Sequence, residues 1–182
     1  MRVVLIRHPE TVASCLGQFP RKDEGYSEEG KRQFQELTRI NPTGKIITSD
    51  LPRCLHLAEA IAKRYDVSLT IEPRIREIDM GVFQGYTFTQ LEEMFPMEVA
   101  TWMQDPDNFT YPDGERYLDF RQRVLEFAGE LAEGAYTLIT HHGVIQVLLS
   151  HWVGDDMSAM PFPCAQSQVL ERIDGHWILT KE

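Results

Sequence analysis

Arginine and histidine side chains follow three short apolar runs of the chain. Arg7 and His8 come directly after the β-branched run 3–6, and Arg53 and His141 stand shortly after two similar runs. A guanidinium binds phosphate oxygens through two parallel N–H donors and keeps its charge, while imidazole is a base and a nucleophile near neutral pH. Such groups meeting at one place would bind a phosphoryl group and accept it covalently.

Each of these residues also has a structural interpretation. Taken singly, His8 could bond to backbone at a strand end, and Arg7 or Arg53 could pair with surface carboxylates of an acidic chain. The pair His141 and His142 could ligate a metal, but neighbouring residues of an extended segment point to opposite faces, and carboxylates at supporting spacing are absent from the sequence. The joint placement favours the phosphate-binding interpretation, and no metal site is expected.

Short strands alternating with amphipathic helices must position these side chains. The clearest helix begins at Pro52, which suits the first helical position, and carries an apolar stripe to Tyr65. Asp174-Gly175 marks the turn of a hairpin. Periodicity and end signals predict helices over 28–39, 115–133 and 144–152 and strands over 3–6, 45–48, 67–71, 137–140, 168–173 and 176–180.

This order of elements predicts an α/β fold, a three-layer αβα sandwich with a mostly parallel central sheet and an antiparallel edge. Ligands of such sheets bind beyond the carboxyl ends of the strands, where the arginines and histidines stand. Residues 74–114, rich in Gly, Pro and aromatic residues, predict an irregular, lid-like excursion. Its aromatic side chains could line a pocket for a heterocyclic leaving group or form the excursion's own core. With no repeat or linker, we expect one domain over 1–182.

Composition excludes several classes of protein. The 182 residues carry 18 Lys and Arg against 28 Asp and Glu, a formal charge of −10, which disfavours binding to nucleic acid or to acidic membranes. Three cysteines without a CxxC pair suggest neither a disulfide framework nor a zinc site. The only continuous apolar run near the N-terminus is too short for a signal peptide or a membrane span, so a cytoplasmic location is expected. Oligomeric state stays open.

Five segments in order resemble the signature of the histidine phosphatase superfamily, whose fold is phosphoglycerate mutase-like. The resemblance covers almost the whole chain, and five ordered segments are far more specific than one Arg-His dipeptide. The segments are Arg7-His8, Ser49-Asp50-Leu51-Pro52-Arg53, Arg76-Glu77-Ile78-Asp79-Met80-Gly81 with Gln84-Gly85, Pro112-Asp113-Gly114-Glu115, and Thr140-His141 near Gly143.

The resemblance implies a role for each residue of the set. His8 would be the nucleophile that becomes a phosphohistidine. Arg7, Arg53 and His141 would surround the phosphoryl oxygens and stabilise the charge that develops there. Glu77 would protonate the leaving alkoxide and then activate water. Neither a metal nor a cofactor is implied.

The sequence departs from the usual family pattern at three positions. Pro9 replaces the glycine after the nucleophile, Ser14 stands where many members have asparagine, and His142 replaces a second glycine. Ser14 and His142 are therefore candidate substrate-binding residues. Because Pro9 removes a backbone N–H and restrains His8, a non-catalytic, phosphate-binding relative remains an alternative.

Within the superfamily, the resemblance implies a phosphomonoesterase that hydrolyses a small-molecule phosphate ester. Cofactor-dependent phosphoglycerate mutases, the other alternative, carry extra segments that retain their intermediate, and this chain looks too short to hold them. The segment Cys15-Leu16-Gly17-Gln18 resembles small bacterial phosphatases that act on α-ribazole-5′-phosphate in cobalamin assembly, with Leu16 where those have an aromatic residue. That compound is the specific substrate expectation.

Overall fold

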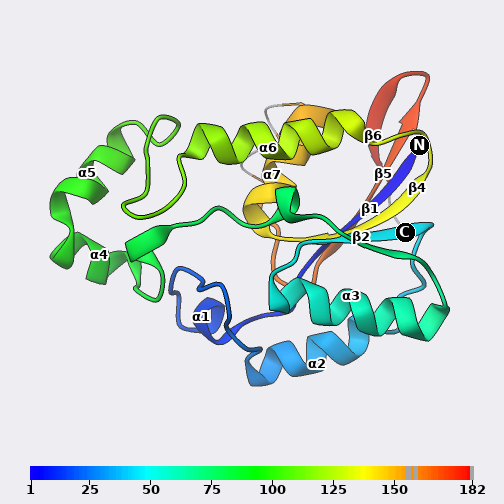
Figure 1. Ribbon diagram of the computed structural model, residues 1–182, viewed down its shortest axis with the longest axis horizontal. Coiled ribbons are helices and arrows are strands. Elements are labelled where there is room, and N and C mark those ends of the chain that lie inside the picture. Colours follow the sequence, from blue (N-terminus) through cyan, green and yellow to red (C-terminus); the bar gives the residue numbers. More distant parts are fainter. Residues whose placement is uncertain (155–156, 158–159, 181–182) are drawn as a thin grey trace.

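A single six-stranded sheet forms the centre of the protein, and its strand order is β3-β2-β4-β1-β5-β6. The computed structural model describes residues 1–154, 157 and 160–180 (Figure 1). Strands β1 to β4 run parallel, β5 runs antiparallel to β1, and β6 antiparallel to β5. The strands are β1 (Arg2–Arg7), β2 (Lys45–Thr48), β3 (Leu69–Ile71), β4 (Ala135–Thr140), β5 (Ser167–Ile173) and β6 (His176–Thr180).

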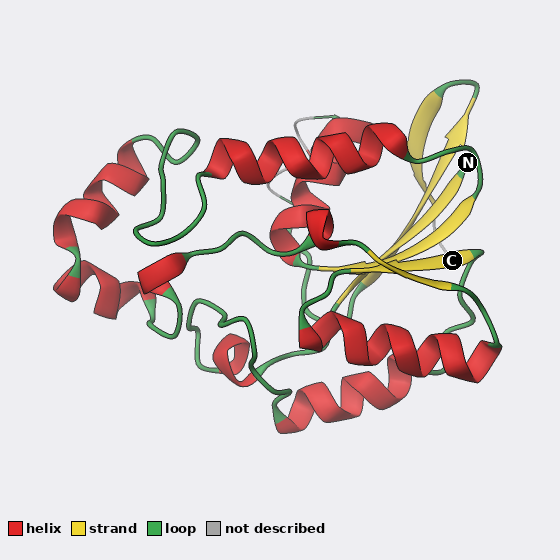
Figure 2. Ribbon diagram, in the orientation of Figure 1, coloured by secondary structure: helices red, strands yellow, loops and turns green. Residues whose placement is uncertain are grey.

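Helices cover both faces of this sheet (Figure 2). The helices are α1 (Val12–Cys15), α2 (Glu28–Leu37), α3 (Pro52–Tyr65), α4 (Phe88–Met94), α5 (Pro96–Gln104), α6 (Tyr117–Glu130) and α7 (His142–Trp152), with 3₁₀ turns η1 (Pro73–Ile75) and η2 (Gly81–Phe83). Ser27 caps α2 by accepting from the Gly30 N–H, and Pro52 occupies the first turn of α3, as predicted.

The alternation of side chains along β1 divides the core into two layers. Val3 and Leu5 pack with α6 and α7 on one face, whereas Val4 and Ile6 pack with α2 and α3 on the other. A strand buried on both faces is continuously apolar because successive side chains point in opposite directions. The predicted α/β fold with a mostly parallel sheet and helices on both sides is confirmed.

The excursion is more regular than predicted. Helices α4 and α5 and the turn η2 lie within it, and α4 and α5 project away from the sheet (Figure 1). Thr87 forms a capping box with Gln90 at the start of α4, and Pro96 occupies the first turn of α5. The many prolines of this stretch predicted irregular structure, although proline at a first turn begins a helix as readily as it interrupts one.

Aromatic side chains form a core of their own inside this excursion. Phe83 is fully buried, and its ring centroid lies 5.6 Å from that of Tyr111 and 6.1 Å from those of Trp102 and Phe109. Edge-to-face and offset rings at these separations stabilise one another beyond simple burial. Of the two interpretations given for the aromatic residues, this cluster therefore fits the second. It forms the core of the excursion rather than the lining of a substrate pocket.

Two features are absent from the described ranges of the chain. None of their helices is both long and apolar enough to cross a bilayer. They also contain no group of three His, Cys, Asp or Glu side chains placed to hold a metal ion. The single domain over 1–182 stays a prediction, and residues 155–156, 158–159 and 181–182 of it lie outside the described part.

Candidate active site

The register of the two central parallel strands brings the first pair of site residues together. Arg7 of β1 is the partner of Thr140 in β4, and the next residues along each strand are His8 and His141. The His8 N–H donates to the Thr140 carbonyl at 3.1 Å, and the two imidazole centroids lie 5.2 Å apart. The carboxyl edge of the sheet thus carries both histidines, as predicted.

The hydrogen bond of His8 fixes which ring nitrogen is free. Its Nδ1 lies 2.7 Å from the carbonyl oxygen of Pro9, and because a carbonyl only accepts, Nδ1 carries the proton. Burial, followed by the charge of Arg53, lowers the pKa of His8 well below its ordinary value. The ring is therefore neutral at pH 7 with the Nε2 lone pair unprotonated, which is the form that attacks phosphorus.

His141 is held in the opposite tautomer. Arg53 Nε donates to His141 Nδ1 at 3.3 Å, so Nε2 of the neutral ring carries the proton and donates to Ser49 Oγ at 2.8 Å. Burial, followed by the charge of Arg53, lowers the pKa of His141 well below its ordinary value. The Cys54 sulfur, fully buried, lies 3.4 Å from Nε2. His141 therefore presents an N–H donor.

Arg53 also fixes the loop that follows α1. Its Nη1 donates to the carbonyl of Arg21 at 2.8 Å. The loop pairs with a later segment, because Phe19 N–H donates to the Tyr86 carbonyl at 2.9 Å and Gly85 N–H to the Phe19 carbonyl at 2.8 Å. Gly85 has φ +86°, and a Cβ there would lie 2.3 Å from Arg21 Nη2. Arg21 was not predicted as a site residue, and the only signal for it in the sequence was the pair of cations Arg21 and Lys22 after Pro20.

Arg7 and His142 each offer an unused buried nitrogen. Arg7 Nη1 donates to the Phe162 carbonyl at 2.6 Å, but its Nε has no hydrogen-bond partner within the described part of the chain. The same holds there for Nδ1 of His142, whose pKa is lowered by burial and by Arg7. His142 is the first residue of α7, not part of an extended segment as assumed from the sequence. Within the described part of the chain, neither nitrogen is committed to another protein group.

Ser14 is hydrogen-bonded within the first turn of α1. Its hydroxyl lies 2.8 Å from Thr11 Oγ1, and its N–H donates to that same oxygen at 3.2 Å, which caps α1. Among the described hydrogen bonds, none joins Ser14 to His8, Arg53 or His141. Its predicted part in substrate binding stays a prediction.

Glu77 is the carboxylate of the set, and α7 helps to hold it. The side chain is nearly buried, and its Oε2 accepts from the Gly143 N–H at 3.3 Å while Oε1 accepts from the Ile78 N–H at 3.3 Å. A Cβ at Gly143 would lie only 2.6 Å from Glu77 Oε1. A side chain at Gly143 would therefore displace the Glu77 carboxylate from the start of α7, where the N-terminal N–H groups favour a carboxylate.

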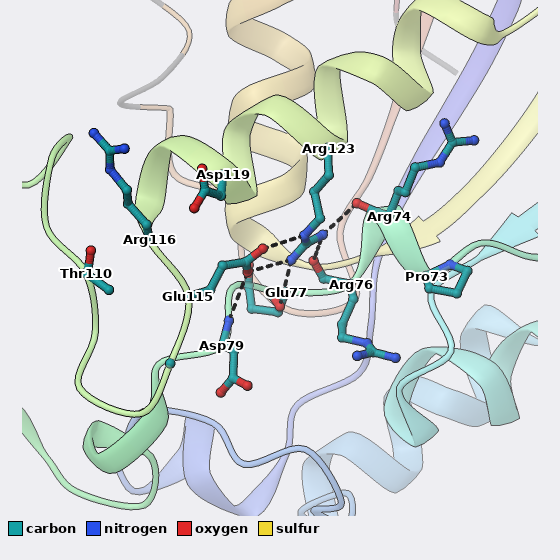
Figure 3. A pocket seen from close by; sticks show the side chains of 11 residues that line it. Pro73, Arg74, Arg76, Glu77, Asp79, Thr110, Glu115, Arg116, Asp119 and Arg123 are labelled. Carbon is teal, nitrogen blue, oxygen red and sulfur yellow. Dashed lines mark hydrogen bonds and ion pairs between the residues drawn. The ribbon is translucent and has the colours of Figure 1, made fainter.

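Cavities open on two sides of this carboxylate. A space of about 10 Å³, which is roughly the size of one water molecule, lies between Arg21, Arg53 and Glu77. A cavity of about 680 Å³ borders Glu77 on the side of α6 (Figure 3), and one of about 820 Å³ lies beside Arg21 and Tyr86. The arrangement joins a nucleophile, two guanidinium groups and a carboxylate, which is the donor set that phosphoryl transfer to imidazole requires.

Comparisons with known proteins agree with this geometry. Among curated proteins, 6-phosphofructo-2-kinase/fructose-2,6-bisphosphatase of Aquarana catesbeiana is 31% identical over 166 residues, 88% of this chain and 34% of that protein. Human 6-phosphofructo-2-kinase/fructose-2,6-bisphosphatase 1 is 30% identical over 166 residues, which again make up 88% of this chain and 34% of that protein. The chain spans about a third of the length of these relatives.

Solved structures agree in fold. The α-ribazole phosphatase of Shigella flexneri superimposes with a TM-score of 0.88 at 21% identity, covering 99% of this chain and 95% of that one. The protein TTHB049 of Thermus thermophilus gives 0.77 at 25% identity, covering 98% of each chain. The family model for the histidine phosphatase superfamily (branch 1) matches residues 3–181. The chain therefore belongs to the histidine phosphatase superfamily.

Proposed function

We propose that this protein is a metal-independent phosphomonoesterase that hydrolyses a small-molecule phosphate ester through a phosphohistidine at His8. The observation that carries the proposal is the neutral imidazole of His8, whose Nδ1 is bonded to the Pro9 carbonyl and whose Nε2, beside two arginines, has no hydrogen bond to another described residue. Membership of the superfamily supports it. We also propose the cytoplasm, expected from the sequence, as its location.

In the first step, the His8 Nε2 lone pair attacks phosphorus, an N–P bond forms and the ester P–O bond breaks. The leaving oxygen takes a proton from the Glu77 carboxyl group, which becomes a carboxylate. Arg7 Nε and the Arg53 guanidinium bind the equatorial oxygens, on which the negative charge of the transition state is spread. His141 adds its Nε2–H, which Ser49 accepts in the free enzyme.

In the second step, water attacks phosphorus and transfers a proton to the Glu77 carboxylate. The N–P bond breaks, its electron pair returns to His8 Nε2, and inorganic phosphate leaves. The carboxyl group of Glu77 is thereby protonated again, so the cycle consumes only ester and water.

The substrate class is a small phosphate ester with a leaving group that occupies the 680 Å³ cavity beside Glu77 or the 820 Å³ cavity beside Arg21. The names of the similar proteins suggest two compounds to test, α-ribazole-5′-phosphate and fructose 2,6-bisphosphate. The 820 Å³ cavity borders Arg21 and Tyr86, an arrangement that offers a cation and an aromatic face to a leaving group. His142 Nδ1 would accept a hydrogen bond from a substrate hydroxyl.

The test is hydrolysis of p-nitrophenyl phosphate in the presence of EDTA. We expect turnover by the wild-type protein, and loss of at least about 10⁴-fold in His8→Ala, because removing a nucleophile leaves only binding and electrostatic effects. His151→Ala, on the exposed part of α7, is the matched control. Full activity of His8→Ala, or a metal requirement, would overturn the proposal.

A second measurement separates hydrolysis from phosphoryl transfer between hydroxyls. Phosphorus NMR of a panel containing the two named esters, sugar phosphates and phosphoglycerates would follow phosphate release directly. Isomerisation of a phosphoglycerate without release would favour the mutase alternative. Phosphate binding without turnover of any ester would favour a binding protein.

A further inference from the structure

Glu77 lies in a loop between two 3₁₀ turns, so no helix or strand fixes its backbone. The two hydrogen bonds to its carboxylate are both long, at 3.3 Å. A proton donor in catalysis must be held close to the leaving oxygen, and a small displacement is costly. The backbone of this loop therefore needs another support.

Arg123, from the middle of α6, supplies that support. Its Nη1 donates to the carbonyl oxygens of Arg74 and Arg76 at 2.6 and 2.7 Å, and its Nη2 donates to the Glu77 carbonyl at 3.3 Å. Nε and Nη2 also bind the two carboxylate oxygens of Glu115, at 2.7 and 2.9 Å. Figure 3 shows the pair Arg123–Glu115 beside Glu77 at the wall of the 680 Å³ cavity.

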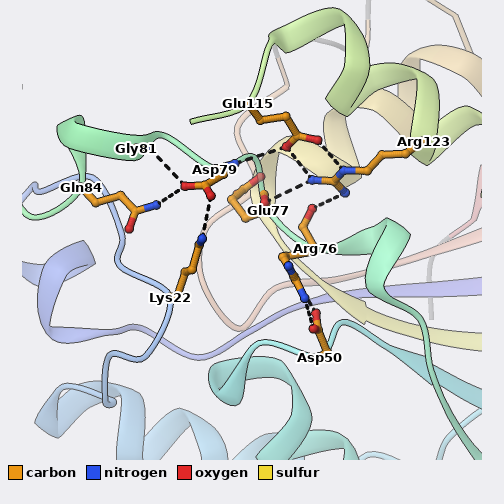
Figure 4. Close-up of polar contacts among 9 residues, drawn as sticks. All are labelled: Lys22, Asp50, Arg76, Glu77, Asp79, Gly81, Gln84, Glu115 and Arg123. Carbon is orange, nitrogen blue, oxygen red and sulfur yellow. Dashed lines mark hydrogen bonds and ion pairs between the residues drawn. The ribbon is translucent and has the colours of Figure 1, made fainter. Parts of the chain in front are cut away.

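Glu115 extends the support to the other side of Glu77. The Asp79 N–H donates to Glu115 Oε2 at 3.3 Å, and the Glu115 N–H donates to the Asp79 carbonyl at 2.8 Å. Asp79 is bound in turn by Lys22 Nζ at 2.6 Å and by Gln84 at 2.8 Å (Figure 4). The loop is thus held both before and after Glu77 by one guanidinium and its partner carboxylate.

The guanidinium is suited to this task. Arg123 is largely buried and lies 4.9 Å from the centroid of the Phe120 ring, which restricts its movement. Its planar fork makes five hydrogen bonds to four residues, and lysine, with a single ammonium group, would not reproduce that pattern. Every bond goes to a backbone carbonyl or to Glu115, so Arg123 has no donor left for a phosphate.

We propose that Arg123, neutralised by Glu115, is the positioning residue for Glu77 and acts only through the proton transfers that Glu77 makes, the first of which is to the leaving group. The inference rests on the proposed function. It predicts different effects on alkyl and on aryl phosphate esters, because only the leaving group of an alkyl ester needs an acid. An alkoxide must be protonated as it leaves, whereas p-nitrophenolate is a stable anion that leaves without a proton.

The experiment compares kcat/KM of Arg123→Gln on glycerol 3-phosphate and on p-nitrophenyl phosphate. This ratio reports the steps up to departure of the leaving group, so the later attack of water does not affect it. We expect a loss of about 100-fold on the alkyl ester, the usual cost of a misplaced catalytic group, and a loss of at most about 5-fold on the aryl ester. Glu115→Gln is expected to show the same difference at smaller size.

Arg121→Gln is the matched control, because Arg121 lies on the same helix and is exposed. It is expected to keep the wild-type ratio between the two esters. Equal losses on both esters in Arg123→Gln would assign Arg123 a merely structural role, and no loss on either would leave it without a role; both overturn the proposal.

If Arg123→Gln does not fold, by circular dichroism, Arg123→Lys replaces it. We expect that variant to lose about 10-fold on the alkyl ester, because one ammonium group replaces part of the fork. Equal losses on both esters would again overturn the inference. Failure of the wild-type protein to hydrolyse either ester is a different result, which overturns the proposed phosphatase itself.

Discussion

The two halves of the candidate site are held in different ways. The nucleophile half consists of His8 and His141, which follow the ends of β1 and β4, and of Arg53 in the first turn of α3, and all three side chains are buried. The acid half consists of Glu77 with the groups that hold it, Gly143 and Arg123, and it lies in a loop beside α6 and α7. Sheet register and the start of α3 fix the first half, whereas hydrogen bonds from a few side chains and from the Gly143 N–H hold the second.

Charge also differs between the halves. Around the histidines, the cations of Arg7 and Arg53 face neutral imidazoles and are not neutralised there by a carboxylate within ion-pair distance among the described residues. At the loop that carries Glu77, Arg123 is paired with Glu115 and Arg76 with Asp50. The guanidinium groups that hold the acid loop are thus neutralised by carboxylates, whereas Arg7 and Arg53 keep their positive charge for the phosphoryl group.

The largest expected effect comes from breaking the nucleophile half. Arg53→Ala removes a guanidinium from the phosphoryl group and a hydrogen bond from His141. We expect kcat/KM to fall by about 10³-fold or more, equally on aryl and alkyl phosphates, because charge on the transferring group develops with either leaving group. A loss confined to alkyl esters, measured by steady-state kinetics, would contradict this division of the site.

A smaller effect is expected from breaking the acid half. Gly143→Ala adds a Cβ that would lie 2.6 Å from Glu77 Oε1, so the carboxylate must move. We expect kcat/KM to fall by about 100-fold on alkyl phosphates and far less on p-nitrophenyl phosphate. Gly129→Ala in α6, where a Cβ meets no atom within 4 Å, is the control and is expected to keep wild-type activity. Equal losses on both esters in Gly143→Ala would contradict the assignment of Glu77.

The smallest expected effect is on the free energy of unfolding, and it tests the difference in charge between the two halves of the site. Burial and Arg53 lower the pKa of His8 and of His141 in the folded state, so below pH 6.5 the unfolded chain binds protons that the folded protein does not. Stability is fully present above that pH and falls on acidification, by up to about 1.4 kcal/mol per pH unit for each histidine.

Urea unfolding between pH 7.5 and 5.0 measures this dependence. His8→Asn is expected to lose one histidine's share of the slope, because asparagine does not titrate. A free energy of unfolding that stays constant or rises from pH 6.5 to pH 5.0 would contradict the lowered pKa of both histidines.

The same division decides how much the sequence could predict. Apolar runs predicted β1 and β4, and the residues after them, His8 and His141, meet as expected because parallel strands end at one edge. The position of Arg53 could be predicted because it comes directly after Pro52, which marks the start of α3. Sheet and helix periodicity are local patterns, so a single sequence contains enough information to place these side chains.

The acid half could not be predicted in the same way. Glu77 was identified only by resemblance, because its loop has no periodicity and its position depends on contacts with residues distant in sequence. Arg123 is 46 residues from Glu77, and on α6 it looks like any other charged residue of a helix. Gly143 was named only as part of a motif. That a side chain at this position would displace the Glu77 carboxylate is visible only when Glu77 is in place.

Cys54 gives the nucleophile half a property of a different kind. Its thiol is fully buried against His141, and burial raises its pKa, whereas Cys15 on the short helix α1 is exposed. A thiol reagent reaches a buried sulfur only when the surrounding structure opens. Cys15 and Cys54 are therefore two natural labelling sites with different accessibility. Cys15 reacts freely, whereas the rate at which Cys54 is modified measures how often the catalytic histidines become exposed to solvent.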